Sequence, residues 1–159
     1  MDDDDFDGDD DMDRVPVSGA QLLASFFTDA PAAGHPALRA RIPRVRAHLL
    51  TYLDTEAERY LTTGELALLD AERQLEPLDA VLRVTGAEAL LAALPGFCHP
   101  AWLLPSVADA RAQLRVVSGL RHWLAASDEL AGLDIACLTL EVDAAVRRAR
   151  AVLGRAPAT

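Results

Sequence analysis

The chain of 159 residues contains no lysine and no asparagine, and its 15 basic residues are all arginine. The absence of asparagine excludes N-glycosylation, which requires an Asn-X-Ser/Thr acceptor. The coding bias of a GC-rich genome is the simplest account of both absences, because lysine and asparagine codons are rich in A and T. We therefore expect a bacterial protein, and the two absences carry no information about its function.

Cysteine and long apolar runs are also scarce. The two cysteines, Cys98 and Cys137, form no CxxC pair, so the sequence offers no disulfide framework. The N-terminus lacks the basic and apolar regions of a secretory signal. The most apolar stretch, residues 88–105, is interrupted by Pro95, Gly96 and Pro100, which argues against a membrane span. We expect a cytoplasmic protein with no membrane partner.

The net charge of −10 comes almost entirely from one end of the chain. Residues 1–13 hold nine of the 25 acidic residues and none of the arginines, so the other 16 acids nearly balance the 15 arginines. A segment this acidic and this poor in apolar residues is typical of disorder. We expect a disordered Asp-rich tail over residues 1–16, an all-helical domain over 17–154 and a flexible C-terminus over 155–159.

Read from Asp3, the tail begins like the calcium-binding loop of an EF-hand. Asp3, Asp5, Asp7 and Gly8 fill the first, third, fifth and sixth positions of that pattern. Arg14 then stands at the twelfth position, where the pattern requires a bidentate glutamate. The tail therefore favours loose, salt-screened binding of divalent cations over a specific calcium site.

Most of the remaining chain shows the periodicity of amphipathic helices, with apolar residues at three- and four-residue steps. No stretch shows convincing strand-like alternation. Three residues stand three positions before a glutamate or glutamine, the pattern of a capping box at a helix start: Ser18, Thr62 and Thr85. We expect an all-α fold, a single compact domain of about six helices in an orthogonal or bundle-like array.

Prolines and caps predict the other helix boundaries. Pro43 is expected to start a long helix, because proline is tolerated in a first turn and removes a hydrogen bond in an interior. Thr139 is expected to cap the last helix. The segment "PGFCHP", residues 95–100, is expected to be a loop because of its glycine and prolines.

Residue types that carry chemistry occur without the spacing that chemistry requires. The histidines form no HxxH, HExxH or Cys/His finger pattern: His35, His48, His99 and His122. Cys98 beside His99 suggests a nucleophile with its base, but adjacency in sequence supplies neither hydrogen-bond reach nor an oxyanion donor. We expect no catalytic, metal or cofactor site, and a non-enzyme is favoured over an enzyme of unrecognised type.

Arginines gather in two segments, "RARIPRVR" and "RRARAVLGR". The clusters comprise Arg39, Arg41, Arg44 and Arg46, and Arg147, Arg148, Arg150 and Arg155. Positive charge at a helix C-terminus is favourable, which explains the second cluster without a function, whereas the first surrounds a helix start. Both can meet nucleic-acid phosphate or an acidic partner. The tail itself is such a partner, and it is expected to fold back and mask them.

Two aromatic residues, Phe97 and Trp102, lie in or beside the expected loop. Aromatic side chains there either anchor a protein interface or cover the protein's own core. The favoured function is a small helical protein-interaction or regulatory module whose partner is another protein. The first alternative is a nucleic-acid-binding regulator that uses the arginine clusters gated by the tail. The second is an enzyme of unrecognised type.

Overall fold

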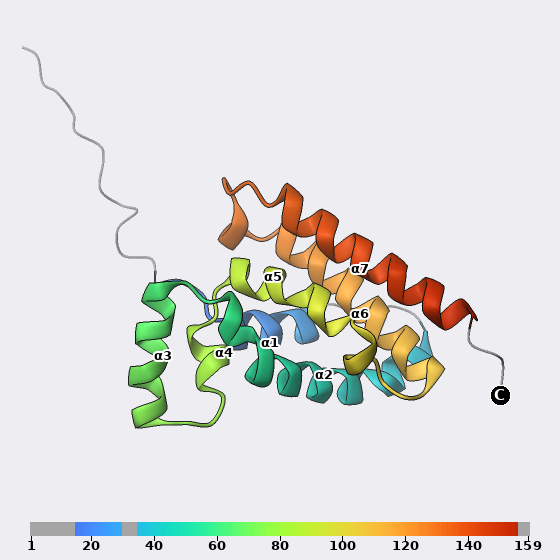
Figure 1. Ribbon diagram of the computed structural model, residues 1–159, viewed down its shortest axis with the longest axis horizontal. Coiled ribbons are helices and arrows are strands. Elements are labelled where there is room, and N and C mark those ends of the chain that lie inside the picture. The colour runs from blue at the N-terminus through green and yellow to red at the C-terminus, as the bar shows by residue number, and fades with distance from the viewer. Residues whose placement is uncertain (1–14, 30–34, 156–159) are drawn as a thin grey trace, which may run out of the picture.

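The computed structural model describes residues 15–29 and 35–155. Within these ranges the protein is helical and has no strand, so the all-α prediction is confirmed, with seven α-helices where about six were expected (Figure 1). They are α1 (Gly19–Asp29), α2 (Pro36–Glu56), α3 (Thr63–Leu75), α4 (Ala80–Val84), α5 (Ala87–Phe97), α6 (Val107–Ala125) and α7 (Ala136–Arg155). Short 3-10 turns cover Ala57–Tyr60, Pro100–Trp102 and Asp128–Leu130.

The domain boundaries stay predictions. The expected tail lies outside the described residues except for Val15 and Pro16, which are exposed and not helical. The expected flexible C-terminus also lies outside them, except that Arg155 is the last residue of α7. None of the described helices is both long enough and apolar enough to cross a membrane.

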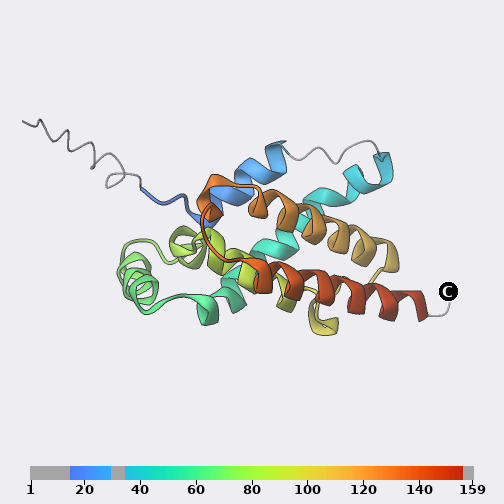
Figure 2. The same ribbon diagram turned by 90° about the horizontal axis from the view of Figure 1, so that it is seen from above.

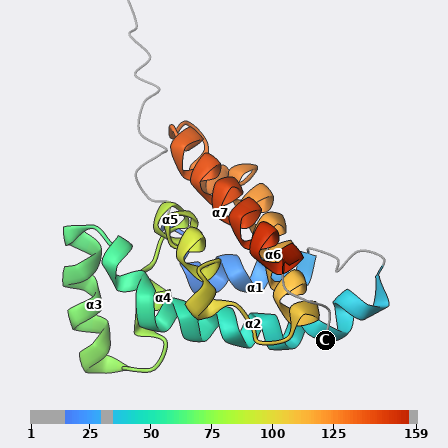
Figure 3. The ribbon, with the colours of Figure 1, turned by 45° about the vertical axis from the view of Figure 1, so that its right-hand side comes forward.

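The helices α6 and α7 run side by side and antiparallel, and α5 packs against both (Figures 1 and 2). Helix α2 packs on α6 from the other side, whereas α3 stands at the edge of the molecule and packs mainly on α4 (Figure 3). The N-terminal ends of α2 and α6 and the C-terminal end of α7 lie at the same end of the molecule (Figure 2). This arrangement gathers parts of the chain that are distant in sequence.

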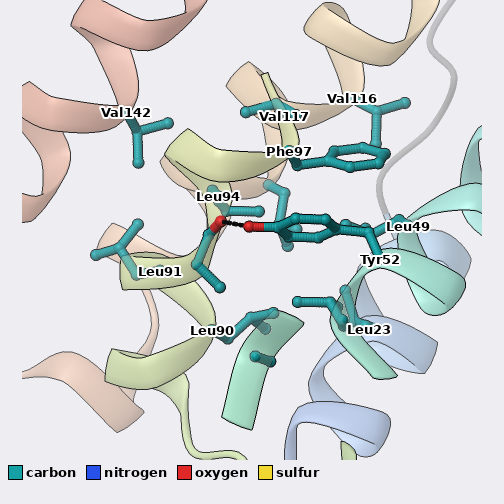
Figure 4. Close-up of a cluster of buried hydrophobic side chains, with 14 of the residues drawn as sticks. Leu23, Leu49, Tyr52, Leu90, Leu91, Leu94, Phe97, Val116, Val117 and Val142 are labelled. Atoms are coloured by element: carbon teal, nitrogen blue, oxygen red, sulfur yellow. Dashed lines mark hydrogen bonds between the residues drawn. The ribbon is translucent and has the colours of Figure 1, made fainter. Parts of the chain in front are cut away.

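The core is built around α5, in which seven of the 11 residues are buried. The Tyr52 ring, from α2, lies among the apolar side chains of this core, where its hydroxyl donates a hydrogen bond of 2.6 Å to the Ala93 carbonyl (Figure 4). Burial raises the pKa of Tyr52 well above its usual value, so the phenol keeps its proton and remains a donor. One polar contact thereby fixes α2 against α5.

Two of the three predicted capping boxes are confirmed, and the third is wrong. Ser18 exchanges hydrogen bonds of 2.9 and 3.3 Å with Gln21, and Thr62 forms the same reciprocal box with Glu65. Thr85 does not cap α5: its hydroxyl donates to a carbonyl of α4, and its own carbonyl accepts from the amide at the start of α1 at 2.6 Å. Gly86 takes the cap position instead.

The prediction that Pro43 starts a helix is wrong, because α2 is continuous from Pro36 to Glu56 with Pro43 inside it. Pro36 occupies the favourable first turn. Pro43 removes the hydrogen bond to the carbonyl of Arg39, and both residues are exposed, so water can satisfy that carbonyl. Burial of the apolar face beyond Pro43, including Val45 and Leu49, holds the helix together.

Two further boundaries differ from the sequence predictions. Helix α7 begins at Ala136, and the Thr139 hydroxyl donates to the Ala136 carbonyl at 2.9 Å instead of capping a helix. Helix α5 continues through Pro95 and Gly96 to Phe97, so only the second half of the expected 95–100 loop lies outside it. The buried face of α5 prevails over the helix-breaking tendency of these two residues.

Candidate functional site

A cavity of about 550 Å³ lies where the N-terminal ends of α2 and α6 meet the C-terminal end of α7. Leucine and alanine side chains line its walls, and basic side chains surround them. The lining residues are His35, Ala37, Leu38, Arg41, Ala108, Arg111, Ala112, Leu114, Arg115, Arg150, Leu153 and Gly154. No acidic residue belongs to this lining among the residues that the structure describes. We term this cavity the arginine groove.

On α2 and α6, lining residues of the arginine groove are three or four positions apart, so they lie on one face of their helix. Arg111 and Arg115 are four residues apart on α6 and therefore share one face. The first turns of α2 place Leu38 and Arg41 three residues apart, again on one face. The last turns of α7 supply Arg150. The cationic rim thus comes from three helices.

Asp109 fixes one side of the groove. Its carboxylate is buried, with 6% of the side chain exposed, and accepts hydrogen bonds from Arg41 and, at 3.2 Å, from Arg44. It lies in the first turn of α6, where the helix dipole favours a negative charge. The acid therefore holds α2 against α6 and orients Arg41 at the groove edge, while balancing part of the charge of the first arginine cluster.

The positive charges of Arg111 and Arg115 are not compensated in this way by an acidic side chain among the described residues. Both are exposed, and in the part of the chain that the structure describes neither has an ion-pair or hydrogen-bond partner. Like charges four residues apart on a helix are unfavourable by a few tenths of a kcal/mol. Arg150 contacts only a neutral group, the Ser118 hydroxyl, at 3.4 Å. Three guanidinium groups with no acidic partner among the described residues thus lie beside apolar walls.

The structure brings the two predicted arginine clusters together at this site, through Arg41 of the first and Arg150 of the second. Of the remaining members of the first cluster, Arg44 pairs with Asp109, and Arg39 is exposed outside the groove. Arg46 lies over the Phe27 ring at 5.5 Å, a cation–π contact within the protein.

The other predicted site residues lie outside the arginine groove. Arg147, Arg148 and Arg155 are exposed on α7 and do not line it. Phe97 is fully buried, so it offers no surface to a partner and instead covers the protein's own core. Trp102 is half-buried and packs edge-on against the core residue Tyr52 at 5.0 Å between ring centroids. These aromatic residues are therefore part of the packing.

Sequence reasoning missed Arg111 and Arg115, which carry most of the uncompensated charge. Their only signal is a pair of arginines at four-residue spacing within a strongly periodic helix. That spacing is common on solvated helix faces, so it does not identify a site alone. The sequence suggests no role for His35 beyond a metal pattern that it does not complete, and the structure places it at the groove.

Cys98 and His99 do not form a catalytic pair. Cys98 is buried, and burial raises the pKa of its thiol to about 12. His99 is exposed, and its Nδ1 accepts a hydrogen bond of 3.2 Å from the Ala101 amide. The thiol therefore stays protonated at neutral pH, and among the described residues no hydrogen bond joins it to the imidazole that would activate it. Thiol catalysis at this position gains no support.

The two cysteines are expected to differ sharply in reactivity. Cys137 is exposed and Cys98 is buried, so a chromogenic thiol reagent such as DTNB should titrate about one thiol per native chain at pH 8. The second thiol, that of Cys98, should react only in denaturant. C137S should remove the native reaction, and a fast reaction of C137S without denaturant would contradict the burial of Cys98.

Comparisons with known proteins do not assign the site. No protein-family model matches the chain, and no curated protein sequence or solved structure matches it. In residues 15–29 and 35–155, no group of three or more His, Cys, Asp or Glu side chains is placed to hold a metal ion. The arginine groove is therefore the feature from which a function has to be argued.

Proposed function

We propose that the protein is an interaction module whose arginine groove binds an acidic segment of a partner protein. The observation that carries the proposal is the convergence of Arg111, Arg115 and Arg150 on one cavity, in whose lining the described part of the chain places no acidic residue. Guanidinium groups form paired hydrogen bonds with carboxylates, which gives such a contact direction as well as charge. The occupant is thus expected to present several aspartates or glutamates.

The apolar walls narrow the class of ligand. Leu38 and Leu153 are half-buried at the groove, so part of their surface is available to an aliphatic or aromatic side chain. Burying such a side chain contributes about 25 cal/mol per Å² of apolar surface, which adds affinity that salt does not screen. An acidic segment with interspersed apolar residues fits both parts of the site.

Nucleic acid fits this geometry less well. Among the described residues His35 is the one aromatic ring in the lining, with no Phe, Tyr or Trp to stack a base, and the buried Asp109 already compensates Arg41 and Arg44. A concave site of about 550 Å³ admits a few side chains, whereas a duplex backbone is contacted by an extended basic face. Nucleic-acid binding is therefore the alternative that the binding test below has to distinguish from binding of an acidic peptide.

The test uses a fluorescein-labelled peptide of aspartate pairs alternating with leucine, measured by fluorescence anisotropy at about 0.1 M salt. The wild-type chain is expected to bind it with a Kd of about 10–100 μM, as for a small surface contact. R111E/R115E, which reverses two exposed charges in the groove, is expected to bind at least about tenfold more weakly, a loss of about 1.4 kcal/mol.

The matched control is R147E/R148E, which makes the same charge change on exposed arginines of α7 outside the groove. It is expected to stay within about twofold of wild type, because neither side chain lines the groove and an exposed charge outside the contact contributes little in salt. An equal loss in both variants would mean general electrostatic attraction and would refute the groove as the site. Tighter binding to mixed-sequence duplex DNA, weakened by both variants, would favour the nucleic-acid alternative.

A further inference from the structure

We infer that the arginine groove of one molecule binds the Asp-rich tail, residues 2–13, of a second copy of the same chain. This inference rests on the proposed function, because it names a particular acidic segment as the occupant of that groove. The tail has the composition that the groove selects: nine aspartates and no basic residue, interrupted by Phe6 and Met12. The groove supplies the complementary charge through Arg41, Arg111, Arg115 and Arg150.

The fold places the root of the tail far from the groove of its own molecule. The Gly19 amide is bonded to the Thr85 carbonyl, and the segment from Val15 to Ser18 precedes it at the end of the molecule opposite the C-terminal end of α7 (Figures 1 and 2). The groove lies at the C-terminal end of α7. Val15, the first described residue, therefore lies at one end of the molecule, and the groove lies at the other.

The length of chain available can be compared with this separation. From Gly19 to Phe26 along α1 is about 10 Å, and from Gly119, which abuts Phe26, to Arg111 along α6 is about 12 Å. Including the ring contact and the four residues from Val15, the path through the molecule is about 40 Å, which is an upper limit on the direct separation. Phe6 stands nine residues before Val15, which is about 30 Å even when fully extended.

In its own molecule, therefore, the tail has to run back along the length of the fold to reach the groove. A second copy has no such restriction, because its whole tail can approach the groove from solvent. The contact joins two different surfaces and is heterologous, so each pair of molecules keeps one free tail and one free groove. Association is then expected to continue head to tail as the protein concentration rises.

The test measures the weight-average mass of the full chain by light scattering or sedimentation at about 0.1 M salt, where the repulsion between net-negative molecules is screened. The wild type is expected to rise at least twofold above its 17.1 kDa monomer mass between about 10 μM and 1 mM, and to return to it at about 0.5 M salt. The control R147E/R148E is expected to behave as wild type.

Two variants test the tail and the groove separately. The tail variant replaces the nine aspartates of residues 2–13 by asparagine, and the groove variant is R111E/R115E. Each alone is expected to stay monomeric, and their equimolar mixture is expected to form a one-to-one dimer through the intact groove of the first and the intact tail of the second. Neutralising the tail also lowers the net charge, which by itself promotes association, so a loss of association identifies the specific contact.

The outcomes distinguish this inference from the proposed function. A wild type that stays monomeric at 1 mM but binds the aspartate–leucine peptide through Arg111 and Arg115 would overturn the inference and leave the proposed function intact. Monomeric wild type with tighter peptide binding by the tail variant would place the tail in its own groove and also overturn the inference. Failure of both self-association and peptide binding would overturn the two proposals together.

Discussion

Replacing Gln113 by leucine is expected to lower the free energy of unfolding by about 3 kcal/mol. Gln113 is fully buried, and its amide joins three backbone groups that precede α6. Its Oε1 accepts from the Leu104 amide at 2.9 Å, and its Nε2 donates to the Phe97 and Trp102 carbonyls at 2.9 and 3.0 Å. Leucine has a similar volume, so the expected loss is one of hydrogen bonds and not of packing.

The size of this loss in the free energy of unfolding depends on which backbone groups would lose their hydrogen-bond partner. The Trp102 carbonyl also accepts from His48 Nε2 at 2.7 Å, so it keeps one hydrogen bond. The Leu104 amide and the Phe97 carbonyl lose theirs, and each buried unsatisfied group costs about 1–3 kcal/mol. The Gln113 side chain thereby fixes the chain that leads into the first turn of α6, which carries Asp109 and the groove arginines.

Urea unfolding monitored by circular dichroism measures this loss. The matched control is Q74L on α3, where Gln74 is exposed and substitution is expected to change the free energy of unfolding by no more than about 0.5 kcal/mol. A loss below about 1 kcal/mol for Q113L would show that the buried amide does not hold this segment.

The second large effect is expected at Gly96, where alanine should cost about 2–3 kcal/mol. A Cβ at this position would lie 2.3 Å from the Tyr52 hydroxyl oxygen, far closer than atoms can approach. Tyr52 is buried and its hydroxyl is held by the Ala93 carbonyl, so the ring cannot retreat without breaking that bond or moving its neighbours (Figure 4). The glycine is thus required by the close approach of α2 to α5.

G119A is the matched control, because it is the same substitution within a helix. Its Cβ would lie 3.6 Å from the Phe26 ring, an ordinary contact, and alanine in a helix interior is favoured over glycine by up to about 1 kcal/mol. Thermal unfolding should therefore show opposite signs, a lower Tm for G96A and a higher Tm for G119A. A neutral G96A would contradict the close approach of α2 to α5.

Features that depend on neighbouring residues could be predicted from the sequence. The capping boxes at Ser18 and Thr62 are local, since each joins side chain and backbone three positions apart. Thr85 matches the same pattern, but its carbonyl is taken by the amide of Gly19, from a helix far back in the chain. A local pattern cannot reveal that competing partner.

The arginine groove required tertiary structure for the same reason. Each predicted cluster supplied one lining arginine, Arg41 and Arg150, and the fold determines that these two face the same cavity. The pairing of Asp109 with Arg41 and Arg44 likewise joins α6 to α2 across a long stretch of chain. Sequence alone indicates that arginines are clustered, whereas the packing of α2, α6 and α7 decides which of them remain uncompensated.

The most direct test of the central claim is a map of the binding site by NMR. The amide resonances of the ¹⁵N-labelled wild-type chain are followed while the unlabelled aspartate–leucine peptide is added. We predict saturable shifts that are largest around Arg111, Arg115 and Leu153, with α3 unaffected. Shifts concentrated instead on the exposed leucines of α3, such as Leu68 and Leu75, or spread evenly over all arginines, would contradict the account.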